Sequence, residues 1–153
     1  NGYSLVRKIL FKDHNVDLNQ YVESLQATVA EAVLAPTKIY VKPILALLKE
    51  VEVHGMAHIT GGGFDENIPR TLPEGHGVVI NKNSYPMPPI FNYLKELGNL
   101  DEREMYNVFN MGIGMIIIVS KDSVQKTMEV LTEAGETPHI IGHVVAEEGV
   151  QLV

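Results

Sequence analysis

The spacing of apolar positions predicts helices in the first third of the chain. Leucine, isoleucine and valine recur at helical intervals in three early segments, which is typical of helices with one buried face. These segments are residues 5–10, residues 17–34, which Pro36 ends, and residues 42–50. Residues 1–52 therefore form a helical lead-in to the rest of the chain.

From residue 53 onward, strands and helices are expected to alternate. Val53–Thr60 contains Gly55 and ends at three glycines, which favours a strand. Met111–Val119 is almost wholly apolar, which predicts a central strand buried on both faces. Further strands are expected at residues 77–81, 140–146 and 150–153, the last two as a hairpin, with helices at 64–70, 90–97, 101–108 and 120–135. This order predicts an α+β domain, its helices packed on a mixed sheet formed by residues 53–153.

Composition narrows the class of protein. The chain has 153 residues, 45% of them hydrophobic and 20% charged, which fits one globular domain. A net charge of -7 disfavours nucleic acid as a partner, and the longest apolar run is too short to span a membrane. The absence of cysteine excludes disulfides and suits a cytoplasmic location. Because the chain starts at Asn1 rather than methionine, we expect it to be part of a longer polypeptide.

A glycine loop is the strongest candidate for chemistry. His58-Ile59-Thr60-Gly61-Gly62-Gly63-Phe64 leads from a predicted strand into a predicted helix. Bare backbone at a helix start can bind phosphate through N–H groups, although the same glycines also suit a plain tight turn. The segment has neither the Lys-Ser/Thr of a P-loop nor the spacing of a dinucleotide fingerprint.

Polar residues near this loop could complete an anion site. Asn67 and Arg70 are three apart, so on one helix they would share a side, and Arg70 could bind a phosphate or carboxylate. The alternative is a surface arginine that pairs with Asp65 or Glu66. His54 and His58 have a spacing that suits a metal only on a helix, and on a strand they are too far apart. The pair His139 and His143 meets the same objection, so no metal site is expected.

An ordered series of segments resembles the aminoimidazole ribonucleotide synthetase (phosphoribosylformylglycinamidine cyclo-ligase) family. The series comprises the glycine loop, Glu66-Asn67-Ile68-Pro69-Arg70, Pro88-Pro89-Ile90-Phe91 and Phe109-Asn110-Met111-Gly112. The resemblance covers essentially the whole chain and implies a three-layer carboxy-terminal domain. It also implies that an amino-terminal domain holding ATP and magnesium is missing. In one departure, Ser84-Tyr85-Pro86 stands where the family usually has tryptophan before the proline.

The resemblance further implies an ATP-dependent ring closure of formylglycinamidine ribonucleotide in purine biosynthesis, by a homodimeric enzyme. It implies a phosphate cradle at Gly61, Gly62 and Gly63, with Asn67 and Arg70 on the substrate phosphate or ribose. His58 would position polar groups, and Asn1 and Gly2 would border the substrate. The chain by itself is expected to be inactive. The alternatives are another member of the superfamily, similar to selenophosphate synthetase, or a non-catalytic module that oligomerises.

Overall fold

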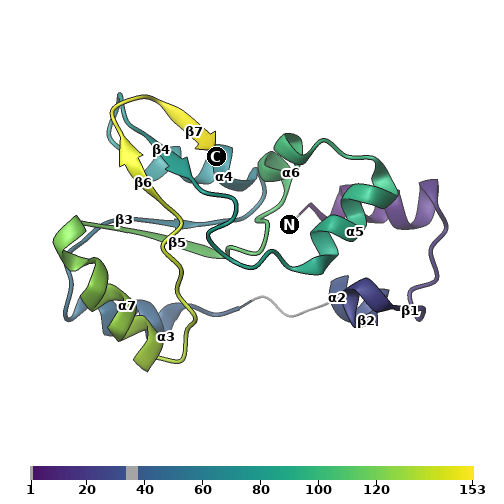
Figure 1. The fold of residues 1–153 in the computed structure, drawn as a ribbon, viewed down its shortest axis with the longest axis horizontal. Coiled ribbons are helices and arrows are strands. Elements are labelled where there is room, and N and C mark those ends of the chain that lie inside the picture. Colours follow the sequence, from purple (N-terminus) through teal and green to yellow (C-terminus); the bar gives the residue numbers. More distant parts are fainter. Residues whose placement is uncertain (1, 34–37) are drawn as a thin grey trace.

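The computed structural model describes residues 2–33 and 38–153, so Asn1, Leu34 and Pro36 lie outside the described residues. Its helices and strands alternate along the chain (Figure 1). In order, the elements are α1 (Tyr3–Arg7), the π-helix η1 (Lys8–Asp13), β1 (Tyr21–Val22), the 3-10 helix η2 (Glu23–Leu25), β2 (Ala27–Thr28), α2 (Val29–Val33), α3 (Val41–Leu48), β3 (Val53–His58), α4 (Gly63–Asn67), the 3-10 helix η3 (Pro69–Thr71), β4 (Gly77–Ile80), α5 (Pro89–Gly98), α6 (Glu102–Val108), β5 (Met115–Val119), the 3-10 helix η4 (Lys121–Ser123), α7 (Val124–Glu133), β6 (Gly142–Val145) and β7 (Gly149–Leu152).

The lead-in is only partly helical. The first predicted helix is confirmed by α1 and η1, which bury Val6, Ile9 and Leu10. The predicted helix over 17–34 is wrong, because β1, η2 and β2 come first and α2 begins only at Val29. A capping box sets that start: the Glu31 N–H donates to Thr28 Oγ1 at 3.1 Å and the Thr28 N–H donates to Glu31 Oε1 at 3.1 Å.

The strand expected after residue 52 is confirmed as β3, which pairs antiparallel with β5. The prediction for Met111–Val119 is wrong in two respects. The strand begins at Met115, after a turn, and in the described part of the chain β5 pairs with β3 only, so it is an edge strand. Its faces are nevertheless packed, since Ile116 joins the main core while Ile117 and Val119 contact a second cluster.

The other sheet is mixed, with strand order β6-β4-β7. β4 runs antiparallel to β6 and parallel to β7. The predicted hairpin of residues 140–146 and 150–153 is therefore wrong, because β4 lies between the two strands. Gly77 permits this insertion: a Cβ there would collide with the carbonyl oxygens of Glu147 and Gly149 in the connecting turn. A turn of this sequence is ordinarily typical of a hairpin.

Helices cover both faces of the β3–β5 pair, which gives the expected α+β architecture (Figure 1). On one side α3 and α7 pack through a cluster of Leu47, Val51, Val130 and Leu131. On the other side lies the main core, where Phe64, Tyr106 and Leu94 meet side chains of α1 and η1. Residues of the lead-in and of the later sheets therefore share one core.

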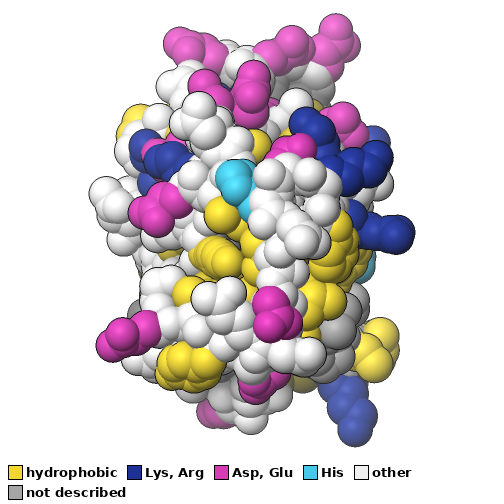
Figure 2. All heavy atoms as spheres, turned by 90° about the vertical axis from the view of Figure 1, so that its right-hand side faces the viewer, with side chains coloured by type: hydrophobic (Ala, Val, Ile, Leu, Met, Phe, Trp, Pro, Cys, Tyr) yellow, Lys and Arg dark blue, Asp and Glu magenta, His cyan; other side chains and the backbone are white. Residues whose placement is uncertain are grey.

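The surface at the α5 and β1 end is partly apolar. Hydrophobic side chains gather across the middle of this face, with carboxylates toward its top (Figure 2). Tyr3, Phe11 and Tyr21, from α1, η1 and β1, are exposed by 50%, 45% and 60%. Among the described residues, no helix has the length and apolar character needed to cross a membrane.

Candidate functional site: two adjoining loops

The glycine loop forms a closed turn between β3 and α4. The Gly63 N–H donates to the Thr60 carbonyl at 3.0 Å, and Gly62 has φ 93° and ψ -9°. These values belong to the third position of a type II turn, which places Gly61 at the second position. Gly62 must adopt a positive φ, so glycine is the residue that this turn favours.

The buried side chain of Asn67 binds the carbonyl groups of the loop. Its side-chain amide donates to the carbonyl oxygens of Gly63 at 2.8 Å and of Thr60 and Gly61 at 3.3 Å each, and the residue is only 6% exposed. A trans peptide directs its C=O and the next N–H to opposite sides. The Gly61 and Gly62 N–H groups therefore point away from Asn67, and within the described residues they make no hydrogen bond.

The three glycines thus differ in what they can do. Gly61 is open to solvent, since a Cβ built there meets no atom within 4 Å. Gly63 is buried, its N–H is used by the turn, and a Cβ there would collide with the Tyr106 carbonyl oxygen. A cradle for an anion can use the N–H groups of Gly61 and Gly62, whereas Gly63 lets α4 approach α6.

A carboxylate lies over the loop. A Cβ on Gly62 would collide with the carboxylate of Glu66, so Glu66 occupies the space beside the loop backbone. Arg70 Nη2 lies 3.9 Å from Glu66 Oε2, and both side chains are more than half exposed, so the pairing is weak. An anion would therefore bind only if Glu66 moved aside, which would leave the Arg70 guanidinium free to bind the incoming charge.

Asn67 and Arg70 do not share a side, contrary to the prediction from their spacing. The α-helix ends at Asn67, and Pro69 starts a 3-10 turn that changes the angular step between residues. Asn67 is consequently buried under the loop while the Arg70 side chain is 70% exposed. The alternative of a surface arginine paired with Glu66 matches the geometry, and Asp65 binds elsewhere.

Two further candidates, His58 and Gly2, are among the described residues. His58 is on the exposed face of β3, where its ring packs edge-on against Tyr40 with centroids 6.1 Å apart. Its side chain makes no hydrogen bond within the described part of the chain. Gly2 has φ 75° and lies against Phe109, whose ring would be 2.6 Å from an added Cβ. Asn1 is outside the described residues.

A second loop, Asn110–Gly114, adjoins the first. The Ile59 N–H donates to the Gly114 carbonyl at 2.9 Å, which joins the loops where each meets its strand. Met111 has φ 55°, which is unusual for a residue with a side chain. The Tyr85 hydroxyl donates to the Met111 carbonyl at 2.9 Å and holds it in this conformation. The apolar pattern predicted a packed strand from Met111 onward, and no pattern in the sequence indicated this role for Tyr85.

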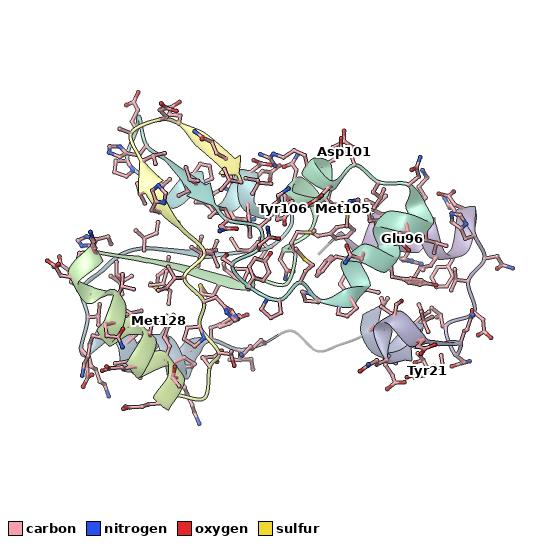
Figure 3. The ribbon with its side chains drawn as sticks, viewed as in Figure 1. Tyr21, Glu96, Asp101, Met105, Tyr106 and Met128 are labelled. Atoms are coloured by element: carbon pink, nitrogen blue, oxygen red, sulfur yellow. The ribbon has the colours of Figure 1, made fainter. Side chains whose placement is uncertain are left out.

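Two buried tyrosines and one ion pair lie in the parts of the chain that flank the two loops. Burial raises the pKa of the Tyr85 hydroxyl, and it also raises the pKa of Tyr106, which lies on α6 (Figure 3). The Tyr106 hydroxyl is buried beside that of Tyr85, and the interaction between the two hydroxyls raises the pKa of Tyr85 and lowers that of Tyr106. Arg103 binds both oxygens of Asp65 at 2.7 Å and the Val150 carbonyl at 3.2 Å, so it ties α6 to α4 and β7. The hydrogen bonds to Asp65 raise the pKa of Arg103.

Together the fold and the loops define a class: an α+β domain whose sheet ends in a glycine turn with two outward N–H groups. The whole chain, residues 1–153, matches the family model described as AIR synthase related protein, C-terminal domain. The chain belongs to this family.

Two curated relatives of the chain carry the same name. The chain is 54% identical over 153 residues to the phosphoribosylformylglycinamidine cyclo-ligase of Bacillus mycoides and 55% identical over 152 residues to that of Oceanobacillus iheyensis. These alignments cover 100% and 99% of this chain but 44% of each relative. The chain therefore spans less than half the length of the curated relatives it matches.

Solved structures with a similar fold include two of Escherichia coli HypE, one of them described as a hydrogenase maturation protein. They have TM-scores of 0.57 and 0.59 at 24% and 22% identity. They cover 75% and 88% of this chain, and 35% and 44% of their own chains are matched. At this identity the likeness supports the fold only.

Proposed function

We propose that this chain is the carboxy-terminal part of a phosphoribosylformylglycinamidine cyclo-ligase and contributes an anion-binding loop to its substrate site. The reaction closes an imidazole ring: ATP phosphorylates the amide oxygen of formylglycinamidine ribonucleotide, a nitrogen attacks the activated carbon, and phosphate leaves. The chemistry depends on positioning the substrate and neutralising phosphate charge.

The outward N–H groups of Gly61 and Gly62 are the observation that carries the proposal. Both have no partner among the described residues, and both are oriented by the buried Asn67, which binds the Thr60 and Gly61 carbonyls of the same two peptides. Two adjacent N–H groups held in this way can bind a phosphate oxygen without further rearrangement of the backbone. Arg70, once separated from Glu66, adds a positive charge.

ATP and magnesium are assigned to the part of the enzyme beyond this chain. Among residues 2–33 and 38–153, no group of three or more histidine, aspartate or glutamate side chains is placed to hold a metal ion. No step of the proposal therefore passes through a metal bound to these residues. The homodimer expected for the intact enzyme would form through the same missing part.

A fusion protein tests the proposal. The part of the Bacillus mycoides relative that precedes the matched region would be joined to this chain, and ADP release would be measured with and without formylglycinamidine ribonucleotide. We expect substrate-dependent ADP release by the fusion and none by the 153-residue chain. A folded fusion that releases no ADP, beside an active Bacillus mycoides control, would contradict the proposal.

A further inference from the structure

Two exposed side chains, Glu66 and Arg70, lie next to the glycine turn. A Cβ added to Gly62 would collide with the Glu66 carboxylate, so this carboxylate sits directly beside the turn. Arg70 Nη2 is 3.9 Å from Glu66 Oε2, and the two side chains are 70% and 57% exposed. Ion pairs of this kind contribute little stability because solvent screens them. Either side chain can therefore exchange its present partner for a ligand at little cost.

The neighbouring polar side chains are already engaged within the protein. Arg103 donates to both oxygens of Asp65 at 2.7 Å. The buried Asn67 amide donates to three carbonyl oxygens of the loop, and its own oxygen accepts from Thr60 Oγ1 at 3.4 Å. Within residues 65–67, Glu66 is thus the side chain whose oxygen atoms remain open to solvent.

A carboxylate this close to a phosphate site favours some ligands and disfavours others. It repels a bare phosphate, whereas hydroxyl groups next to the phosphate can donate to its two oxygens. We propose that Glu66 makes the glycine turn selective for a phosphorylated ribose over phosphate alone. Arg70 leaves Glu66 and binds the phosphate, while the freed carboxylate accepts hydrogen bonds from the adjacent 2- and 3-hydroxyls of the sugar. The inference rests on the proposed function, which places the phosphate on the N–H groups of Gly61 and Gly62.

This exchange of partners predicts two effects of a single substitution. Glu66→Ala removes a negative charge beside the anion and frees Arg70, so inorganic phosphate should bind more tightly, by up to about fivefold for charges this exposed. The same substitution removes the acceptor of the sugar hydroxyls, so the preference for ribose should disappear. A residue that only supports the loop would instead weaken the binding of every ligand together. Because the Glu66 side chain is exposed, the variant leaves the core intact.

Direct binding to the isotope-labelled chain of 153 residues tests the inference without any measurement of activity. The probes are inorganic phosphate, methyl β-D-ribofuranoside 5-phosphate and its 2-deoxy counterpart, and the amide NMR signals of Gly61 and Gly62 report the Kd of each. We expect the 2-deoxy compound to bind the parent chain roughly two- to tenfold more weakly than the ribose compound, and both to bind Glu66→Ala equally. Glu133 is exposed on α7, on the other side of the β3–β5 pair, and Glu133→Ala should behave as the parent.

The outcomes separate this inference from the proposed function. Three results would each overturn the inference while leaving the phosphate site in place: equal affinity of the parent chain for the two sugar phosphates, a ribose preference that survives in Glu66→Ala, or weaker binding of inorganic phosphate by that variant. If none of the three compounds shifts the signals of Gly61 and Gly62, the proposed function itself is contradicted, and the inference falls with it.

Discussion

Replacing Gly61 with proline isolates the contribution of one backbone N–H. Gly61 stands at the second position of the type II turn, where proline is the favoured residue, and no atom lies within 4 Å of an added Cβ. Its carbonyl, which binds Asn67, is retained. The substitution therefore removes the N–H that faces outward and leaves the turn and its support in place.

The expected effect follows from the energy of a hydrogen bond to a charged group. Such a bond contributes roughly 1.5–3 kcal/mol, and about 1.4 kcal/mol corresponds to a tenfold change in binding. In the fusion with the Bacillus mycoides part, Gly61→Pro should thus raise the KM for formylglycinamidine ribonucleotide by roughly 10- to 140-fold. Stability should not fall, because proline at a compatible position restricts the unfolded chain and adds about 0.4–1 kcal/mol.

The assay compares Gly61→Pro with Gly61→Ala, which retains the N–H group. Steady-state ADP release gives kcat and KM, and urea unfolding of the 153-residue chain gives stability. We expect Gly61→Ala to behave as the parent fusion. An unchanged kcat/KM in Gly61→Pro, with stability intact, would refute the assignment of this N–H to substrate. If both variants lose activity equally, the added side chain causes the loss, and a specific role of the Gly61 N–H in substrate binding is excluded.

Three further predictions concern the support of the loops. Gly63→Ala should destabilise the chain by about 2 kcal/mol more than Gly75→Ala in urea unfolding, because both glycines have a positive φ but only at Gly63 does a Cβ collide with backbone. Asn67→Leu should lower the unfolding free energy by about 1–3 kcal/mol through loss of three hydrogen bonds to the loop, while exposed Asn107→Leu should have little effect; equal losses would argue against this role. Because burial raises the pKa of Tyr85 above its ordinary 10.0, the unfolded chain releases this proton first, so stability should fall as pH rises past about 10. Tyr85→Phe should reduce that fall in unfolding measurements from pH 9 to pH 11, and an identical slope would exclude Tyr85 as its source.

Local patterns predicted those parts of the fold that local physics determines. The strand before the glycine loop and the helices with one apolar face were found because alternation, glycine breaks and amphipathic spacing act within a few residues. The capping box at Thr28 and Glu31 was also a local signal, and its neglect produced the long helix wrongly predicted over 17–34. The placement of β4 between β6 and β7 depends on pairing across about half the chain, which no local pattern specifies.

In the candidate site, too, the sequence predicted the local feature but not the contacts between distant residues. The glycine run identified the turn, but the residue that orients it, Asn67, was predicted to face a ligand and instead binds the loop. Arg103 and Asp65 are 38 residues apart, and no spacing rule links them. The left-handed Met111 was missed because its apolar neighbours resemble a strand.

The hydrogen bond from Ile59 to Gly114 has a consequence for motion. It connects the two loops at the points where they meet their strands, so a movement of one loop is transmitted to the other. A ligand that binds only the glycine turn would therefore also shift the start of β5, because the Gly114 carbonyl precedes that strand. Binding at the glycine turn would then change the position of the second loop through the Ile59 N–H.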